Sequence, residues 1–171
     1  PKSCGKCVDS VEIRIDSEDP YNKVGEIQAK GISLMSGYYK NEEATAAAFT
    51  EDGWMRTGDL GLIDKKGNIF IKGRSKNMIL SANGQNIYPE EIEAVVNNQP
   101  YVVESVVIDR GASLVALVYV DSEKLAQDGV SIDEHVKNVQ NEVNKSMPAY
   151  SKISKVEVMD QPFEKTPKMS I

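Results

Sequence analysis

The pattern of the chain changes at residues 73–76, and this change constrains the fold more than any other feature. Before it, short alternating stretches are separated by polar turns; after it, β-branched stretches alternate with amphipathic helical ones. Strands without long intervening helices form small sheets or barrels, whereas hairpins mixed with helices form a compact α+β domain. The sequence therefore predicts an α+β protein with a small β-rich, barrel-like subdomain in residues 1–74. A hinged, compact α+β C-terminal domain follows in residues 75–171.

The first part contains three stretches that favour strands. Ser10–Ile15 alternates at period two, Gly25–Gly31 is a second short strand, and Leu60–Gly73 has the pattern of a hairpin with a turn at Asp64–Asn68. Asn41–Phe49 is rich in alanine with acids at its start, which favours a short helix.

The second part predicts two helices, a hairpin and a final strand. Pro89 suits the first position of a helix, and the glutamates after it suit the positive end of the helix dipole. Residues 102–108 and 114–120 are β-branched and flank a turn, so they form a hairpin. Residues 155–159 give the last strand.

Residues 131–147 form the clearest helix in the sequence. Ser131 and Glu134 make a capping box, and Pro148 ends the helix. The predicted apolar face consists of Ile132, Val136, Val139, Val143 and Met147. His135 lies near the edge of that face, where a histidine is more often a partly exposed packing residue than a ligand or a base.

Composition excludes several classes of function. The net charge of −6 argues against a general nucleic-acid binder, which needs a basic surface. No apolar run approaches the ~20 residues of a transmembrane helix, and no signal peptide is visible. Neither end of the sequence has the character of a natural terminus, so we expect a piece of a longer protein.

The two cysteines, Cys4 and Cys7, form a C-x-x-C motif. A redox pair usually opens a helix, but the residues that follow alternate like a strand. A zinc site needs two more ligands, and His135 is remote in sequence. We expect two reduced thiols in a loop.

Three segments carry the functional pattern: "GWMRTGDLGLID" at 53–64, "GRSKNMILSANGQNIYPEEIE" at 73–93, and "EKTPKMSI" at 164–171. Each segment alone is weak evidence for a function, since Thr-Gly-Asp, for example, is compatible with an ordinary turn. In this order, and with "GEIQAKGISLMSGYY" upstream, they resemble the C-terminal third of adenylate-forming enzymes. That superfamily includes acyl-CoA synthetases, firefly-luciferase-like enzymes and peptide-synthetase adenylation domains.

The resemblance implies roles for three residues. Asp59 matches the aspartate that accepts hydrogen bonds from the ribose hydroxyls of ATP and AMP, a task that suits an ionised carboxylate. Arg74 matches an arginine that contacts the nucleotide, and a guanidinium can make forked bonds to oxygen. Lys76 matches the hinge about which the C-terminal domain rotates between adenylation and thioester formation. The alternatives are a surface charge at Arg74 and a solvated linker lysine at Lys76.

The loop after the hinge matches the segment that lines the coenzyme A channel in the second orientation. Ser81, Asn83 and Gly84 belong to it, and glycine lets the backbone approach a ligand closely. The loop is one residue longer than the commonest form, a feature that some long-chain acyl-CoA synthetases share.

The last segment departs from the family pattern. The family ends in "P-K-T-x-x-G-K", whose final lysine stabilises charge during adenylation. Here Ser170 occupies that lysine position and Met169 replaces the glycine. Lys168 is the candidate catalytic substitute, although a shifted loop is required. Lys165 and Lys168 as plain surface lysines are an equal alternative.

The resemblance implies the C-terminal part of an AMP-forming acyl-CoA synthetase. Such an enzyme uses ATP, with Mg²⁺, to activate a carboxylic acid, here expected to be a fatty acid, and transfers the acyl group to coenzyme A. We expect this piece alone to be inactive without the N-terminal domain of the same chain. The alternatives are an adenylation domain that loads a carrier protein and a non-catalytic two-lobed binding or regulatory module. The expected location is cytoplasmic, with peripheral membrane attachment of the full-length protein left open. Acid identity and oligomeric state are not written in the sequence.

Overall fold

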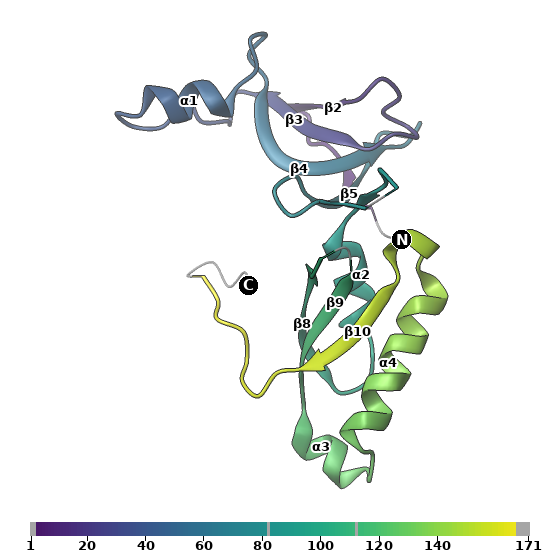
Figure 1. Cartoon of the computed structure of the whole chain (residues 1–171). Helices are drawn as coiled ribbons and strands as arrows, with labels where there is room; N and C mark the ends of the chain where they lie inside the picture. Colours follow the sequence, from purple (N-terminus) through teal and green to yellow (C-terminus); the bar gives the residue numbers. More distant parts are fainter. Residues whose placement is uncertain (1–2, 82, 112, 167–171) are drawn as a thin grey trace. The chain divides into compact units, whose positions relative to one another are not determined.

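The computed structural model describes residues 3–81, 83–111 and 113–166 (Figure 1). The chain divides into two compact units, Pro1–Asn77 and Met78–Ile171. Both units mix helices and strands, which confirms the predicted α+β class. In the described part of the chain, no helix has both the length and the apolar character needed to cross a bilayer.

The first unit is built on one antiparallel sheet. Its strands lie in the order β1-β5-β4-β3-β2, and one short helix, α1, precedes β4. Figure 1 shows that β4 curves strongly along its length. The strands are β1 Gly5–Lys6, β2 Val11–Asp16, β3 Gly25–Gly31, β4 Met55–Ile63 and β5 Asn68–Arg74, and the helix is α1 Glu42–Ala48.

The alternation of apolar and polar residues in β2 fits its place in the sheet, as the sequence predicts. Ile15 of β2 lies opposite Ile27 of β3, and both are buried. The turn of the predicted hairpin is closed by Asp64, whose carboxylate accepts from the backbone N–H groups of Lys66 and Asn68 at 2.8 and 2.9 Å. Helix α1 starts where Asn41 accepts from the N–H of Ala44 at 2.9 Å.

The second unit consists of a three-stranded sheet, a small hairpin and covering helices. The sheet order is β10-β9-β8, with β8 antiparallel and β10 parallel to the central β9. The elements are β6 Ile79–Leu80, β7 Asn86–Ile87, α2 Pro89–Val96, β8 Val102–Asp109, β9 Leu114–Val120, α3 Ser122–Gln127, α4 Ile132–Ser146, the 3₁₀ turn η1 Ala149–Ser151 and β10 Ile153–Val158. The sequence did not predict α3, η1 or the β6–β7 pair, all of which are short.

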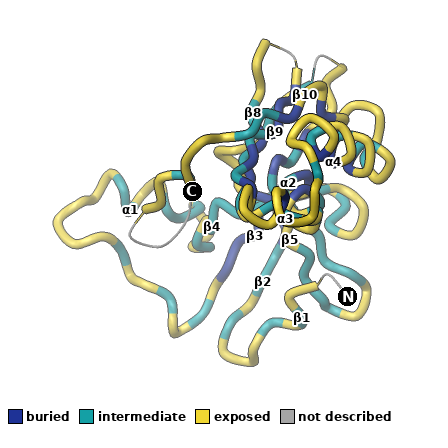
Figure 2. The backbone as a smooth tube through the Cα atoms, turned by 90° about the horizontal axis from the view of Figure 1, so that it is seen from below, coloured by how far each residue is buried: buried dark blue, intermediate teal, exposed yellow. Residues whose placement is uncertain are grey.

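The core of the second unit lies between the sheet and the helices α2 and α4. Figure 2 shows the buried positions gathered there. Ile92 and Val96 of α2, Val118 of β9, and Val139 and Val143 of α4 are at most 2 % exposed. Burial of these side chains is the main stabilising contribution to the unit.

Helix α4 begins at Ile132 with Ser131 as its N-cap, because the Ser131 hydroxyl accepts from the N–H of Glu134 at 3.2 Å, as the predicted capping box requires. Its buried face differs from the prediction. Ile132 is 48 % exposed, whereas His135 is only 4 % exposed and is therefore a core residue rather than a partly exposed one. The His135 ring meets the Tyr101 ring edge-on at 5.6 Å. The face is shifted because His135, Val139 and Val143 lie four residues apart and point to the sheet together.

Candidate functional site

A bulge interrupts β4, the central strand of the first sheet. From Arg56 to Leu60 the strand advances four residues while β3 advances two, from Gln28 to Glu26. The Thr-Gly-Asp of the predicted motif occupies this span, three residues opposite the single Ile27 of β3, so this segment is an irregular part of a strand rather than a free turn. Gly58 has a φ of +74°, which residues with a Cβ rarely adopt.

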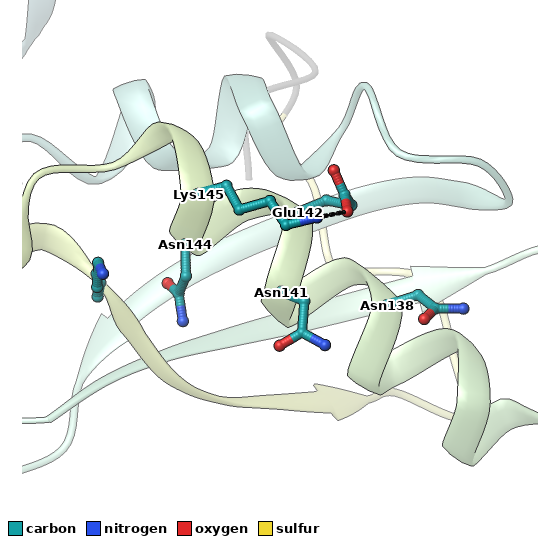
Figure 3. Close-up of a pocket in the computed structure, with 6 residues that line it drawn as sticks. Asn138, Asn141, Glu142, Asn144 and Lys145 are labelled. Carbon is teal, nitrogen blue, oxygen red and sulfur yellow. Dashed lines mark hydrogen bonds and ion pairs between the residues drawn. The ribbon is translucent and has the colours of Figure 1, made fainter.

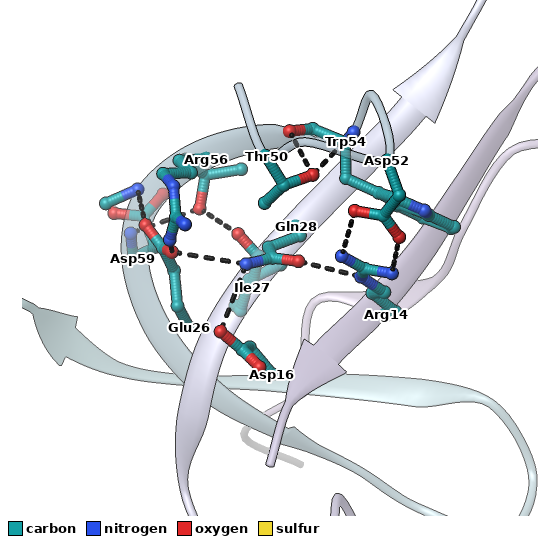
Figure 4. A network of polar contacts seen from close by, with 12 residues as sticks. Arg14, Asp16, Glu26, Ile27, Gln28, Thr50, Asp52, Trp54, Arg56 and Asp59 are labelled. Atoms are coloured by element: carbon teal, nitrogen blue, oxygen red, sulfur yellow. Dashed lines mark hydrogen bonds and ion pairs between the residues drawn. The ribbon is translucent and has the colours of Figure 1, made fainter. Parts of the chain in front are cut away.

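Hydrogen bonds satisfy the backbone groups that the bulge removes from the ladder. The Thr57 hydroxyl donates to the carbonyl of Ile27 at 2.7 Å and accepts from the N–H of Asp59 at 3.1 Å. The N–H of Gly58 donates to Oε1 of Glu26 at 3.3 Å, and the carbonyl of Gly58 accepts from the N–H of Ser75 at 2.9 Å. The bulge is thus held by β3 on one side (Figure 4) and by Ser75, which follows β5, on the other.

The bulge brings Asp59 opposite Arg74 of β5 in the strand register. Nη1 of Arg74 donates to Oδ1 of Asp59 at 2.6 Å. The side chains are 57 % exposed at Arg74 and 30 % at Asp59, so a ligand can reach both. A carboxylate offers about four lone-pair sites, and a guanidinium five donors, so the pair can make further bonds. The geometry fits recognition of a vicinal diol or of another group with both donors and acceptors.

The predicted hinge residue, Lys76, lies at the end of the first unit. It is exposed, and its neighbours are held within that unit: Ser75 by Gly58, and Asn77 through its N–H to the carbonyl of Arg74 at 3.1 Å. The division between the compact units follows Asn77.

The predicted channel loop closes the β6–β7 hairpin in the second unit. The N–H of Ser81 donates to the carbonyl of Gln85, and the N–H of Gly84 to the carbonyl of Ser81, both at 2.9 Å. Asn83 and Gly84 are exposed. Ser81 also borders a hollow of about 360 Å³ in the second unit. The hollow is lined in part by Leu80, Ile87, Ser113, Tyr150 and Lys152.

The segment that follows β10 is attached to β8. The carboxylate of Glu104 accepts from the N–H of Phe163 at 3.2 Å and from Nζ of Lys165. The lysine hydrogen bond holds the pKa of Glu104 below its ordinary value. Lys165 is therefore paired rather than free on the surface. The candidate Lys168 and Ser170 lie outside the described residues.

The two cysteines of the C-x-x-C motif lie at the start of the first unit. Cys4 and Cys7 are free thiols, and Sγ of Cys7 donates to the carbonyl of Val11 at 2.9 Å. Within the residues described, no three or more His, Cys, Asp or Glu side chains gather as a metal site. Neither observation gives the cysteines a role in catalysis.

A polar hollow of about 410 Å³ lies beside α4 (Figure 3). Asn138, Asn141 and Asn144 project from successive turns of the helix, and Lys145 bends toward Glu142 at 2.5 Å. Asn144 serves the fold, because its amide both donates to the carbonyl and accepts from the N–H of Ile153 at 2.8 Å. The hollow is thus a solvated helix face.

Sequence reasoning missed two residues that support the Asp59–Arg74 pair. Thr57 belongs to the Thr-Gly-Asp motif and Glu26 to the upstream "GEIQAKG" segment, but the sequence assigns neither of them a role in the site. The spacing gave no signal for them, because Glu26 and Gly58 lie 32 residues apart. Only the strand pairing brings them together.

Comparisons with known proteins agree on one family. Residues 76–171 match the family model described as AMP-binding enzyme C-terminal domain. The chain is 46 % identical over 89 residues to a sulfoacetate–CoA ligase of Cupriavidus necator, covering 52 % of this chain and 17 % of that one. It is 38 % identical over 120 residues to a long-chain-fatty-acid–CoA ligase of Mycobacterium tuberculosis, covering 70 % of this chain and 19 % of that one.

A solved structure extends the likeness to both units. The O-succinylbenzoate coenzyme A synthetase of Bacillus subtilis, in complex with ATP and magnesium ion, has a TM-score of 0.84 and 28 % identity. The match covers 99 % of this chain and 34 % of that one. The chain thus spans between 17 and 34 % of the length of these three proteins.

Proposed function

Because the chain belongs to the adenylate-forming AMP-binding enzymes, we propose that it is the C-terminal part of an AMP-forming acid–CoA ligase. The full-length enzyme activates a carboxylic acid with ATP as an acyl-adenylate and passes the acyl group to coenzyme A. The remainder of the enzyme supplies the acid pocket and the phosphate loop, and this chain alone has no ligase activity. The domains of the proposal are residues 1–74 and 75–171, with the hinge near Lys76.

The paired side chains of Asp59 and Arg74 carry the proposal. The carboxylate accepts hydrogen bonds from the ribose hydroxyls, and the guanidinium, 2.6 Å from it, donates to nucleotide oxygens while it fixes the carboxylate. ATP brings a good leaving group to the acid, which is otherwise a poor electrophile. No described residue cluster offers a metal site, so we assign no residue of this chain to Mg²⁺.

The other proposed roles belong to the second half-reaction and to charge stabilisation. Lys76 absorbs the backbone rotation between the two orientations. Ser81, Asn83 and Gly84 line the coenzyme A channel after that rotation. Ser170 occupies the position of the family lysine, and Lys168 takes over its role of stabilising the charge that moves during adenylation.

A fatty acid is the proposed substrate class. It is supported by the longer loop and by the M. tuberculosis relative, which matches 70 % of the chain. The matched ligases for sulfoacetate and succinylbenzoate define the competing acids. The test is AMP release by the full-length protein with ATP, coenzyme A and each acid in turn. Release only with the short polar acids contradicts the fatty-acid assignment.

Replacement of the carboxylate tests the nucleotide role. In the full-length protein, Asp59→Ala loses hydrogen bonds to a charged group, worth about 1.5–3 kcal/mol, so the KM for ATP rises about 10- to 150-fold. Glu12→Gln is the matched control, because Glu12 is an exposed carboxylate of the same sheet. An unchanged KM for ATP in Asp59→Ala contradicts the proposal. ATP–pyrophosphate exchange by the 171-residue chain alone contradicts the proposed inactivity.

A further inference from the structure

Glu26 of β3 holds the bulge that carries Asp59. Its Oε1 accepts from the N–H of Gly58 at 3.3 Å, one residue before Asp59. Its side chain is 18 % exposed, well below the 30 % of Asp59. Glu26 therefore reaches the bulge from the neighbouring strand β3 and is less exposed than Asp59.

The position of Glu26 is itself fixed by a chain of polar contacts (Figure 4). Its Oε2 accepts from Nη1 of Arg56 at 2.9 Å and from Nε2 of Gln28 at 3.4 Å. Gln28 is only 1 % exposed, and its Oε1 accepts from Nε of Arg14 at 2.7 Å. A buried amide with both ends bonded has one stable orientation.

The chain ends at an anchored arginine. Arg14 makes two bonds to the carboxylate of Asp52, at 2.5 and 2.9 Å, and lies 4.7 Å from the centre of the Trp54 ring. A forked pair that also stacks on an aromatic ring has little freedom. The contacts thus run without a break from Asp52 through Gln28 to the N–H of Gly58.

We infer that Glu26 is a positioning residue for the nucleotide: it fixes the Gly58 backbone so that Asp59 faces Arg74 and the ribose. This inference rests on the proposed function. Without the Glu26 acceptor, the N–H of Gly58 loses its partner, and the bulge can relax toward a regular strand. The side chain of Asp59, which belongs to the bulge, then moves. A misplacement of a substrate-binding group by about 1 Å can cost a factor of 10² in rate.

The experiment compares four variants of the full-length enzyme in steady-state kinetics. Glu26→Ala is expected to raise the KM for ATP about 10-fold or more, with the KM values for the acid and coenzyme A unchanged. Glu26→Gln keeps an oxygen acceptor in the same shape, so a smaller rise of about 3-fold is expected. Arg56→Ala removes one contact of Glu26 and leaves its bonds to Gly58 and Gln28, so a smaller rise than that of Glu26→Ala is expected.

The fourth variant, Asp59→Ala, separates the two proposals. A normal KM for ATP in Asp59→Ala refutes the nucleotide role itself. A raised KM in Asp59→Ala with a normal one in both Glu26 variants refutes only the positioning role. A rise in Arg56→Ala equal to that in Glu26→Ala also overturns it, because the ion pair would then be the relevant contact. Glu26→Gln keeps the test valid if Glu26→Ala does not fold.

Discussion

Replacement of Gly58 by alanine should destabilise the first unit through backbone conformation alone. The φ of this glycine is +74°, and an added Cβ would meet no atom closer than Nη2 of Arg74 at 3.8 Å, which is ordinary contact. Left-handed backbone costs a residue with a Cβ roughly 1–2 kcal/mol. We expect a loss of that size in the free energy of unfolding.

Gly61 in the same strand provides the steric contrast. A Cβ there would lie 2.5 Å from the carbonyl oxygen of Phe70 and 2.8 Å from Cδ1 of Ile27. The first of these is backbone of β5, so Gly61→Ala must push two paired strands apart. Overpacking of this kind costs about 1–3 kcal/mol. The two alanine variants can therefore lose similar stability for different reasons.

Asparagine at each position distinguishes the two causes. Asparagine tolerates left-handed backbone several-fold better than most residues, so Gly58→Asn should recover about 1 kcal/mol relative to Gly58→Ala. Gly61→Asn should be no better than Gly61→Ala, since a larger side chain meets the same atoms.

The assay uses the single tryptophan of the chain. Trp54 lies in the first unit with the cationic groups of Arg14 and Lys30 at 4.7 and 5.8 Å from its ring centre. Its fluorescence during urea titration therefore follows the unfolding of that unit. If Gly58→Asn is no more stable than Gly58→Ala, or if Gly61→Ala is neutral, the assignment of the two causes is wrong.

Three further perturbations test the second unit. Ile92→Ala removes a side chain that is 1 % exposed and should cost about 2–5 kcal/mol in urea unfolding followed by far-UV circular dichroism; a loss below about 1 kcal/mol would argue against the described core. Burial lowers the pKa of His135, so the unfolded chain binds more protons and stability falls as pH drops from about 6.5 toward that lowered pKa. His135→Phe should reduce the slope of the free energy of unfolding against pH in this range, by at most about 1.4 kcal/mol per pH unit, and should therefore flatten the plot of Tm against pH. A plot of Tm against pH that is unchanged in His135→Phe refutes the buried placement. The pKa of Glu104 is lowered chiefly by Lys165, so the attachment of residues 163–165 is complete above the ordinary glutamate pKa and is lost as pH falls through the lowered one. The hydrogen-exchange protection factor of the Phe163 amide measures this attachment. In Glu104→Gln the protection factor should no longer change with pH in this range.

The strands and helices with strong periodicity were predictable from the sequence. The hairpin at 60–73, the helix from Pro89 and the capped helix from Ser131 all follow local patterns that the structure confirms. The short α3 and the β6–β7 pair were missed, because two to six residues give too little periodicity to detect.

The burial of His135 and the bulge at Thr57–Asp59 were not predictable from local pattern. Which face of α4 packs against the sheet depends on the sheet as well as on the helix. A rotation of the helix about its own axis by less than the angle between two successive residues exchanges Ile132 for His135 on the buried face. The bulge breaks the alternation that identifies a strand, so its residues have the pattern of a turn. A shared nucleotide role for Asp59 and Arg74 was expected only from the family resemblance, and the support from Glu26 depends on a partner 32 residues away.

The central place of β9 determines the order in which the second unit can be completed during synthesis. Its first neighbour, β8, is adjacent in sequence, but its second, β10, pairs Ile153 with Leu114 across an intervening stretch that includes α4. Until residues 153–158 leave the ribosome, one edge of an almost wholly apolar strand has no partner. The nascent chain therefore passes through a stage with an open, aggregation-prone edge, and slow translation of the codons for residues 153–158 prolongs it.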